Sequence, residues 1–184
     1  MIQVSHLTKY YGDFLAVNDL SFEIQDGHVY GFLGPNGAGK STTMNIMTGC
    51  LSPTDGTVKI GGFDILEQPE AAKKLIGTLS KGYRQRVGIA QALFWGPQVI
   101  ILDEPTVGLD SIQIIEIRDF IKELGKTHTV ILSSHILSEV QAVCEQALII
   151  SKGKLVALLA PISEANHLLH LSGRGHQPCA PFFA

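Results

Sequence analysis

The sequence predicts an α/β domain built on a mainly parallel sheet, with an antiparallel β flank at its N-terminal end. Three observations support this fold class: strand-like and helix-like segments alternate along the chain, central strands are continuous apolar runs, and the first strands partly alternate apolar with polar residues. Val99–Leu102 is such a continuous run, as expected for a strand covered on both faces. With 184 residues, 45% of them hydrophobic, the chain can bury the core of one domain.

Glycine and proline divide the first half of the chain into short elements. Gly12 and Asp13 form a turn between the first two apolar segments, and a glycine-rich stretch follows the third. Pro69 suits the first turn of a helix. The expected elements are strands over 2–7, 14–24 and 28–33, a helix over 40–48, a strand over 57–60 and a short helix over 69–76.

The second half repeats the alternation of strands and helices. Gly96 and Pro97 end a long helical segment, and Lys152 and Gly153 separate the strands of a terminal hairpin. The expected elements are helices over 81–95, 111–124 and 136–144, and strands over 99–102, 129–132, 147–150 and 155–159. We expect one domain over residues 1–171, followed by a loose tail over 172–184 that is rich in Gly and Pro.

Charge and cysteine content exclude several classes of function. A net charge of −3 with no basic block argues against nucleic acid as a partner. Three scattered cysteines indicate neither a disulfide framework nor a zinc site, and so favour a reducing compartment. No apolar run reaches the roughly 18 residues of a membrane span, and the N-terminus does not resemble a secretion signal. The sequence therefore predicts a cytoplasmic protein.

The glycine-rich stretch carries the first chemical signal. It reads Gly34-Pro35-Asn36-Gly37-Ala38-Gly39-Lys40-Ser41, and so fits the pattern G-x-x-x-x-G-K-[ST] between a predicted strand and a predicted helix. Glycines allow backbone N–H groups to surround a phosphate at the positive end of the helix. Lys40 can reach the β and γ oxygens of a nucleoside triphosphate, and Ser41 can ligate Mg²⁺. The motif predicts a P-loop NTPase core.

Two carboxylates follow the buried strand Val99–Leu102. Asp103 and Glu104 should lie at the sheet edge where a doubly wound fold opens its ligand crevice. Asp103 can hold Mg²⁺ directly or through water, and Glu104 can orient and deprotonate the water that attacks the γ-phosphate. His135 ends the next buried strand, so it should reach the same rim and contact the γ-phosphate. Lys40, Glu104 and His135 are therefore the candidate catalytic residues.

In this order, the motifs resemble the ATPase subunits of ABC transporters over residues 1–158. The resembling segments are Gly34–Thr42 (Walker A), Leu79–Arg86 (signature motif, in a form frequent in ABC-2 type export systems), Ile100–Glu104 (Walker B), Gly108–Asp110 (D-loop) and His135 (switch histidine). The resemblance implies that Tyr11 stacks on adenine and that Thr42 joins the ATP site. It also implies a head-to-tail homodimer in which Ser80, Gly82 and Asp110 act at the nucleotide sites.

This resemblance implies a function as well. ATP, bound with Mg²⁺, would be hydrolysed by a subunit that energises export through a separate membrane permease. The chain would then lie on the inner face of the cell membrane, as a cytoplasmic protein bound to its permease.

The spacing between Lys40 and Leu79 departs from the family pattern, because it is several tens of residues too short. The missing part holds the Q-loop glutamine and most of the helical subdomain, so the domain is internally shortened near residues 77–79. Leu75–Ser80 resembles both the strand before the Q-loop and the segment before the signature motif. Residues 75–79 can therefore form a strand of the sheet, which we favour, or keep the signature position.

Three functions remain compatible with these residues. The first is ATP hydrolysis by a transporter subunit. The second is a nucleotide-binding remnant that binds Mg·ATP but is defective in the dimer sandwich, in hydrolysis and in transport coupling. The missing Q-loop region favours this second function for transport, and predicts slow hydrolysis, but does not weigh against ATP binding. The third is a soluble ABC-type ATPase without a membrane partner, which is less favoured because such proteins usually carry two of these domains.

Overall fold

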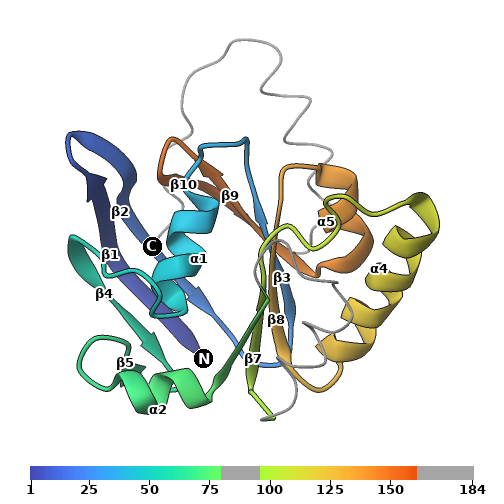
Figure 1. Ribbon diagram of the computed structural model, residues 1–184, viewed down its shortest axis with the longest axis horizontal. Coiled ribbons are helices and arrows are strands. Elements are labelled where there is room, and N and C mark those ends of the chain that lie inside the picture. Colours follow the sequence, from blue (N-terminus) through green and yellow to red (C-terminus); the bar gives the residue numbers. More distant parts are fainter. Residues whose placement is uncertain (80–95, 161–184) are drawn as a thin grey trace.

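The computed structural model describes residues 1–79 and 96–160, which form two sheets with helices between and outside them (Figure 1). The smaller sheet is antiparallel, with the strand order β2-β1-β4-β5. The larger sheet has the order β10-β9-β3-β8-β7-β6 and is parallel except for the β9–β10 pair. These two sheets confirm the predicted fold class.

The strands and helices follow one another largely as predicted. The strands are β1 (Ile2–Tyr11), β2 (Phe14–Ile24), β3 (Val29–Leu33), β4 (Asp55–Ile60), β5 (Phe63–Asp64), β6 (Ile76–Leu79), β7 (Val99–Leu102), β8 (Thr129–Ser134), β9 (Gln146–Ser151) and β10 (Lys154–Leu159). The helices are α1 (Lys40–Met47), α2 (Pro69–Lys74), α4 (Ser111–Gly125) and α5 (Leu137–Val143). The helix predicted over 81–95 and the tail predicted over 172–184 lie outside the described residues. In the part of the chain that is described, no helix is long and apolar enough to cross a bilayer.

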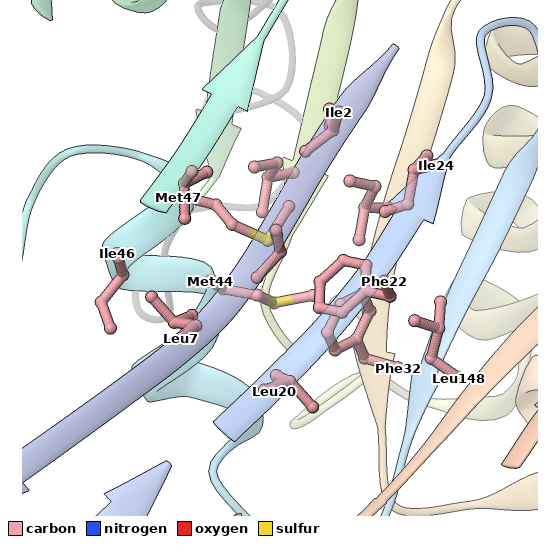
Figure 2. Packing of buried hydrophobic residues seen from close by; sticks show 14 of the residues in the cluster. Ile2, Leu7, Leu20, Phe22, Ile24, Phe32, Met44, Ile46, Met47 and Leu148 are labelled. Carbon is pink, nitrogen blue, oxygen red and sulfur yellow. The ribbon is translucent and has the colours of Figure 1, made fainter. Parts of the chain in front are cut away.

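The central strands β3, β7 and β8 of the parallel sheet are buried on both faces. Val99 and Ile101 of β7 face a core shared with α1 and the antiparallel sheet. Ile100 and Leu102 face a second core that includes α4 and α5. Successive strand side chains point to opposite faces, so one apolar run supplies both cores. In the first core, Phe22 and Phe32 pack edge to face, with 5.4 Å between ring centroids (Figure 2).

The β1–β2 hairpin is longer than its sequence pattern predicts. Pairing continues to Tyr11↔Phe14, on either side of the turn, so β1 extends well beyond the predicted end at Leu7. The register shifts between Val4 and Leu7, and His6 between them has a φ of +52°. Such a bulge breaks the two-residue alternation from which strands are recognised. β1 therefore continues to the hairpin turn, which lies at Gly12 and Asp13 as predicted.

Residues 76–79, the last ones described before residue 80, form a strand. β6 pairs in parallel with β7, from Ile76↔Val99 to Leu79↔Leu102, which confirms the placement that we favoured. α2 ends at Lys74 and not at the predicted Ile76, because the backbone from Ile76 onward pairs with the sheet. Ser80 and Gly82, which follow β6, lie outside the described residues.

Candidate nucleotide-binding site

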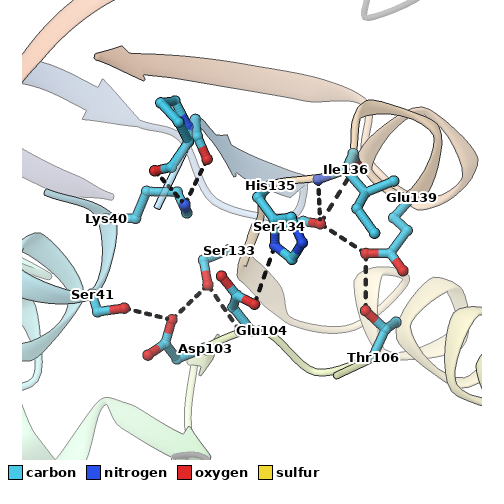
Figure 3. Close-up of polar contacts among 12 residues, drawn as sticks. Lys40, Ser41, Asp103, Glu104, Thr106, Ser133, Ser134, His135, Ile136 and Glu139 are labelled. Atoms are coloured by element: carbon cyan, nitrogen blue, oxygen red, sulfur yellow. Dashed lines mark hydrogen bonds and ion pairs between the residues drawn. The ribbon is translucent and has the colours of Figure 1, made fainter. Parts of the chain in front are cut away.

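The carboxyl ends of three neighbouring strands define the candidate site (Figure 3). β3 leads into the glycine-rich loop and α1, β7 leads into Asp103 and Glu104, and β8 ends beside His135. Both β3 and β7 pair in parallel with β8, so these three ends meet at one edge of the sheet. The fold thereby brings together five predicted residues: Lys40, Ser41, Asp103, Glu104 and His135.

The glycine-rich loop is held by close backbone approaches. Gly39 has a φ of +102°, and a Cβ at this position would lie 2.7 Å from the carbonyl oxygen of Ala16 on β2. A Cβ at Gly34 would lie 2.2 Å from the carbonyl oxygen of Ile150 on β9. Any side chain at either position would push the loop away from these strands, so glycine is required for the loop to stay against the sheet.

Lys40, the first residue of α1, is directed into this loop. The side chain is buried, and its ammonium donates to the carbonyl oxygens of Gly34 at 2.6 Å and Pro35 at 3.1 Å. A buried ammonium needs such partners, because burying an unpaired charge is strongly unfavourable. Phosphate oxygens would offer the same group stronger, charge-assisted hydrogen bonds.

Asp103 receives two hydrogen bonds on one carboxylate oxygen. Ser41 Oγ donates to Asp103 Oδ1 at 3.2 Å, and Ser133 Oγ donates to the same oxygen at 2.6 Å. The first bond joins α1 to the end of β7, and the second joins β8 to it. Together they hold a carboxylate and a hydroxyl side by side below the glycine-rich loop.

Glu104 combines burial with a strained backbone. It is 8% exposed and has a φ of +48°, a conformation that costs a non-glycine residue about 1–3 kcal/mol. Its N–H donates to Ser133 Oγ at 2.8 Å, and its Oε2 lies 3.3 Å from His135 Nδ1. Such strain concentrates at functional sites, where the surrounding structure fixes a side chain in one direction. Here that direction is toward the half-exposed His135.

Sequence reasoning missed the polar residues that hold these loops. Ser133 bridges Asp103 and Glu104, as described above. The buried Glu139 of α5 accepts hydrogen bonds from Ser134 Oγ at 2.7 Å and Thr106 Oγ1 at 2.9 Å, and so ties the end of β8 to the loop after β7. The only signal in the sequence is a pair of serines at the end of an apolar strand, which does not reveal its partners.

A cleft of about 280 Å³ opens along this edge. It is lined by Tyr11, Phe14, Ala16, Asn36, Gly37, Ala38, Gly39, Lys40, Ser41, Thr42 and Glu104. Most of these residues were predicted, including Tyr11 and the loop, whereas Phe14 and Ala16 were not. Their signal in the sequence is their position just after the Gly12-Asp13 turn, where Phe14 is paired with Tyr11.

Asp110 lies at the start of α4 and not at one of the three strand ends that define the candidate site. It caps the N-terminus of α4: its carboxylate accepts from the N–H groups of Ile112 at 3.0 Å and Gln113 at 2.8 Å, and the Gln113 side chain accepts from the Asp110 N–H at 3.3 Å. This reciprocal arrangement is a capping box. Asp110 does not line the cleft.

Comparisons with known proteins agree with this geometry. A family model described as "ABC transporter" matches residues 17–75 and 63–107. The bacitracin transport ATP-binding protein of Bacillus licheniformis is 35% identical over 209 aligned positions, which cover 85% of this chain and 68% of that protein. The lantibiotic transport ATP-binding protein of Streptococcus pyogenes is 34% identical, and the match covers 85% of this chain and 89% of that protein.

Solved structures share the fold. A nucleotide-free ATP-binding cassette from an ABC transporter has a TM-score of 0.83 at 21% identity, covering 92% of this chain and 95% of that one. A dimeric cassette in a post-hydrolysis state with ADP and Pi has a TM-score of 0.78 at 21% identity, covering 87% and 98%. The chain therefore belongs to the ABC transporter family, as one of its ATP-binding, ATP-hydrolysing cassettes.

Proposed function

We propose that this chain binds Mg·ATP in the cleft and hydrolyses it with Glu104 as general base. The observation that carries the proposal is the continuous set of contacts from Ser41 through Asp103 and Ser133 to Glu104 and His135, next to the buried ammonium of Lys40. Phosphate-binding groups, carboxylates and an imidazole thus lie along one sheet edge. This combination suits phosphoryl transfer to water.

The chemistry assigns one role to each group. The N–H groups of residues 34–42 and the Lys40 ammonium would hold the β- and γ-phosphates. Glu104 would orient a water molecule in line with the γ-phosphorus and accept its proton. As the new oxygen–phosphorus bond forms, the bond from that phosphorus to the β–γ bridging oxygen breaks, and its electron pair leaves with ADP. His135 would contact a γ-phosphate oxygen beside Glu104.

The residues present fit a magnesium ion. Ser41 Oγ and Asp103 Oδ1 lie 3.2 Å apart at the end of the phosphate loop. Oxygen donors are those that Mg²⁺ prefers, and a hydroxyl with a carboxylate is the pair that P-loop proteins use. Ser41 and Asp103 would therefore hold the ion, which neutralises charge on the phosphates when bound.

The assembly is proposed from the named relatives, which are transport ATP-binding proteins for bacitracin and lantibiotics. In this proposal the domain of residues 1–171 pairs with a second copy and a separate membrane permease at the cytoplasmic face of the membrane, and energises export. Ser80, Gly82 and Asp110 would then face the nucleotide sites between the two copies.

A second candidate function is a module that binds Mg·ATP without forming a productive dimer or coupling to a permease. Two observations favour it. The alignment with the bacitracin relative runs over 209 positions, more than the 184 residues of this whole chain, so that relative carries residues with no counterpart here. β6 also ends at Leu79, where the segment resembling the signature motif begins. The alignment length supports an internal shortening, and the end of β6 supports its location near residues 77–79.

Calorimetric titration of Mg·ATP tests the proposed site. Wild-type protein should bind, and Lys40→Ala should lose most of the affinity, because the ammonium and the loop contact the same phosphates. Lys59→Ala on β4, away from the cleft-lining residues, is the matched control and should bind like wild type. Wild-type affinity in Lys40→Ala would contradict the assignment of the phosphate loop.

Sedimentation of Glu104→Gln with Mg·ATP separates the two candidates, since slow hydrolysis keeps ATP bound. A dimer that requires ATP supports the transporter subunit. A monomer at all concentrations supports the uncoupled module.

A further inference from the structure

Phe14 is an apolar aromatic side chain left largely in solvent. It is 64% exposed, whereas Phe22 and Phe32 of the same sheets are 8% and 0% exposed. Phe14 is the first residue of β2 and is paired with Tyr11 across the Gly12-Asp13 turn. Tyr11 is itself 48% exposed. Two exposed aromatic residues therefore stand at the same hairpin tip, where nothing in the described core requires them.

Both residues line the same cleft as the phosphate loop. The hairpin is fixed against that loop, because the carbonyl oxygen of Ala16 lies too close to Gly39 to admit a side chain there. Of the residues that line the cleft, those outside the loop, α1 and Glu104 are Tyr11, Phe14 and Ala16 of the hairpin, so the hairpin is the available surface for a base. The polar side chains lining the cleft belong to the phosphate loop, α1 and Glu104, apart from the Tyr11 hydroxyl. The base end is consequently aromatic and apolar.

Tyr11 can offer only one open face to a base. Lys9 Nζ lies over the Tyr11 ring, 5.5 Å from its centroid, and is itself held by a hydrogen bond to the Ser52 carbonyl oxygen at 2.7 Å. This cation covers one side of the ring. A base stacked on the other side leaves a second apolar surface exposed, and Phe14 is the other aromatic side chain among the residues that line the cleft.

We propose that Phe14 is a second base-binding residue, so that the base of a nucleoside triphosphate is held by Tyr11 and Phe14 together. This inference rests on the proposed nucleotide site and specifies its base end. Stacking on aromatic rings tolerates different bases, because each base has a π face. Ring contact with Phe14 should therefore serve Mg·ATP and Mg·GTP alike, and should contribute nothing to binding of the phosphates alone.

The test compares Kd values for Mg·ATP and Mg·GTP, and competition by Mg·tripolyphosphate, across four variants. Phe14→Ala should weaken both nucleotides by about tenfold, the lower range for loss of one aromatic–base contact. Phe14→Tyr keeps a ring and should retain wild-type affinity. Phe63→Ala, which removes an exposed phenylalanine of β5 that does not line the cleft, should bind like wild type. Lys40→Ala should lose both nucleotides and tripolyphosphate.

Two outcomes would overturn the inference. One is unchanged nucleotide affinity in Phe14→Ala while Lys40→Ala loses it, which leaves the proposed site intact but removes Phe14 from it. The other is an equal loss of tripolyphosphate binding in Phe14→Ala, which would mean that the substitution distorts the loop. If wild type and Lys40→Ala bind ATP equally, the proposed function fails, and the inference fails with it.

Discussion

At the scale of single residues, Ser133 organises both carboxylates of the site. Its hydroxyl donates to Asp103 Oδ1 at 2.6 Å and accepts from the Glu104 N–H at 2.8 Å. A hydroxyl has one donor and can still accept, so one side chain satisfies both neighbours. The direction of Asp103 and the strained backbone of Glu104 therefore depend on a residue from the adjacent strand.

Tyr11 allows a test of the base end that is separate from Phe14. Tyr11→Ala should weaken Mg·ATP binding by about tenfold or more, because stacking contributes roughly 1–3 kcal/mol, and Tyr11→Phe should retain it. The measurement is the Kd by calorimetric titration. Tyr10→Ala is the matched control, since Tyr10 is 45% exposed but does not line the cleft. If Tyr10→Ala weakens binding and Tyr11→Ala does not, the base contact lies one residue earlier than proposed.

Cys144 predicts how stability depends on alkaline pH. Burial raises the pKa of the Cys144 thiol well above its ordinary value of 9.0, and the negative charge of Glu145 raises it further. Above pH 9.0 the unfolded chain loses this proton and the folded chain keeps it. The contribution of this thiol to the free energy of unfolding should therefore be complete below that pH and be lost above it, by on the order of 1 kcal/mol per pH unit.

Urea denaturation at several pH values measures this effect. Cys144→Ala removes the thiol, so its unfolding free energy should decline less steeply above pH 9.0 than that of wild type. Cys50→Ala, at the exposed cysteine, should keep the wild-type slope. Parallel declines in wild type and Cys144→Ala would refute the assignment to Cys144.

At the scale of elements, Asp110 is predicted for the nucleotide site of the dimer, and in the structure it caps the N-terminus of α4. Asp110 caps this helix, so Asp110→Ala should lower the free energy of unfolding by about 1 kcal/mol, whereas Asp110→Asn should retain most of it. Binding of Mg·ATP to the monomer should not change in either variant, because Asp110 is outside the cleft lining. Urea denaturation with calorimetry checks both parts. Equal destabilisation by alanine and asparagine would contradict the cap.

The elements also show what the sequence can predict. Buried central strands such as β7 are found with their exact bounds, because a run that fills two cores is apolar throughout. The end of α2 and the length of β1 cannot be predicted in this way, because they depend on how the backbone pairs in the sheets. The two-residue strand β5 carries no periodic signal, and its pairing with β4 at Ile60↔Phe63 exists only in the folded sheet.

The same division applies to the site. Lys40, Ser41, Asp103 and Glu104 are predictable because their chemistry needs fixed residue types beside a strand end. Ser133, Glu139 and Phe14 belong to no such pattern. Their partners come from other strands and helices, so their contacts become visible only when the tertiary structure brings these elements together.

At the scale of the whole molecule, the site exists because one parallel sheet joins strands that are distant in sequence. β3, β7 and β8 contribute the phosphate loop, the two carboxylates and the histidine at one edge. The antiparallel sheet adds the aromatic hairpin beside them. The residues of one chain that we propose to bind Mg·ATP and activate water, from Tyr11 to His135, are therefore brought together before a second copy is considered.

The most direct test of this account is ATP turnover per subunit in wild type and Glu104→Gln, measured with Mg·ATP from nanomolar to high micromolar protein. Glu104→Gln keeps the shape of the side chain but removes the base, so turnover should fall by about 10²- to 10⁴-fold while ATP binding persists. A wild-type rate that Glu104→Gln matches at every protein concentration would contradict Glu104-dependent hydrolysis at this site.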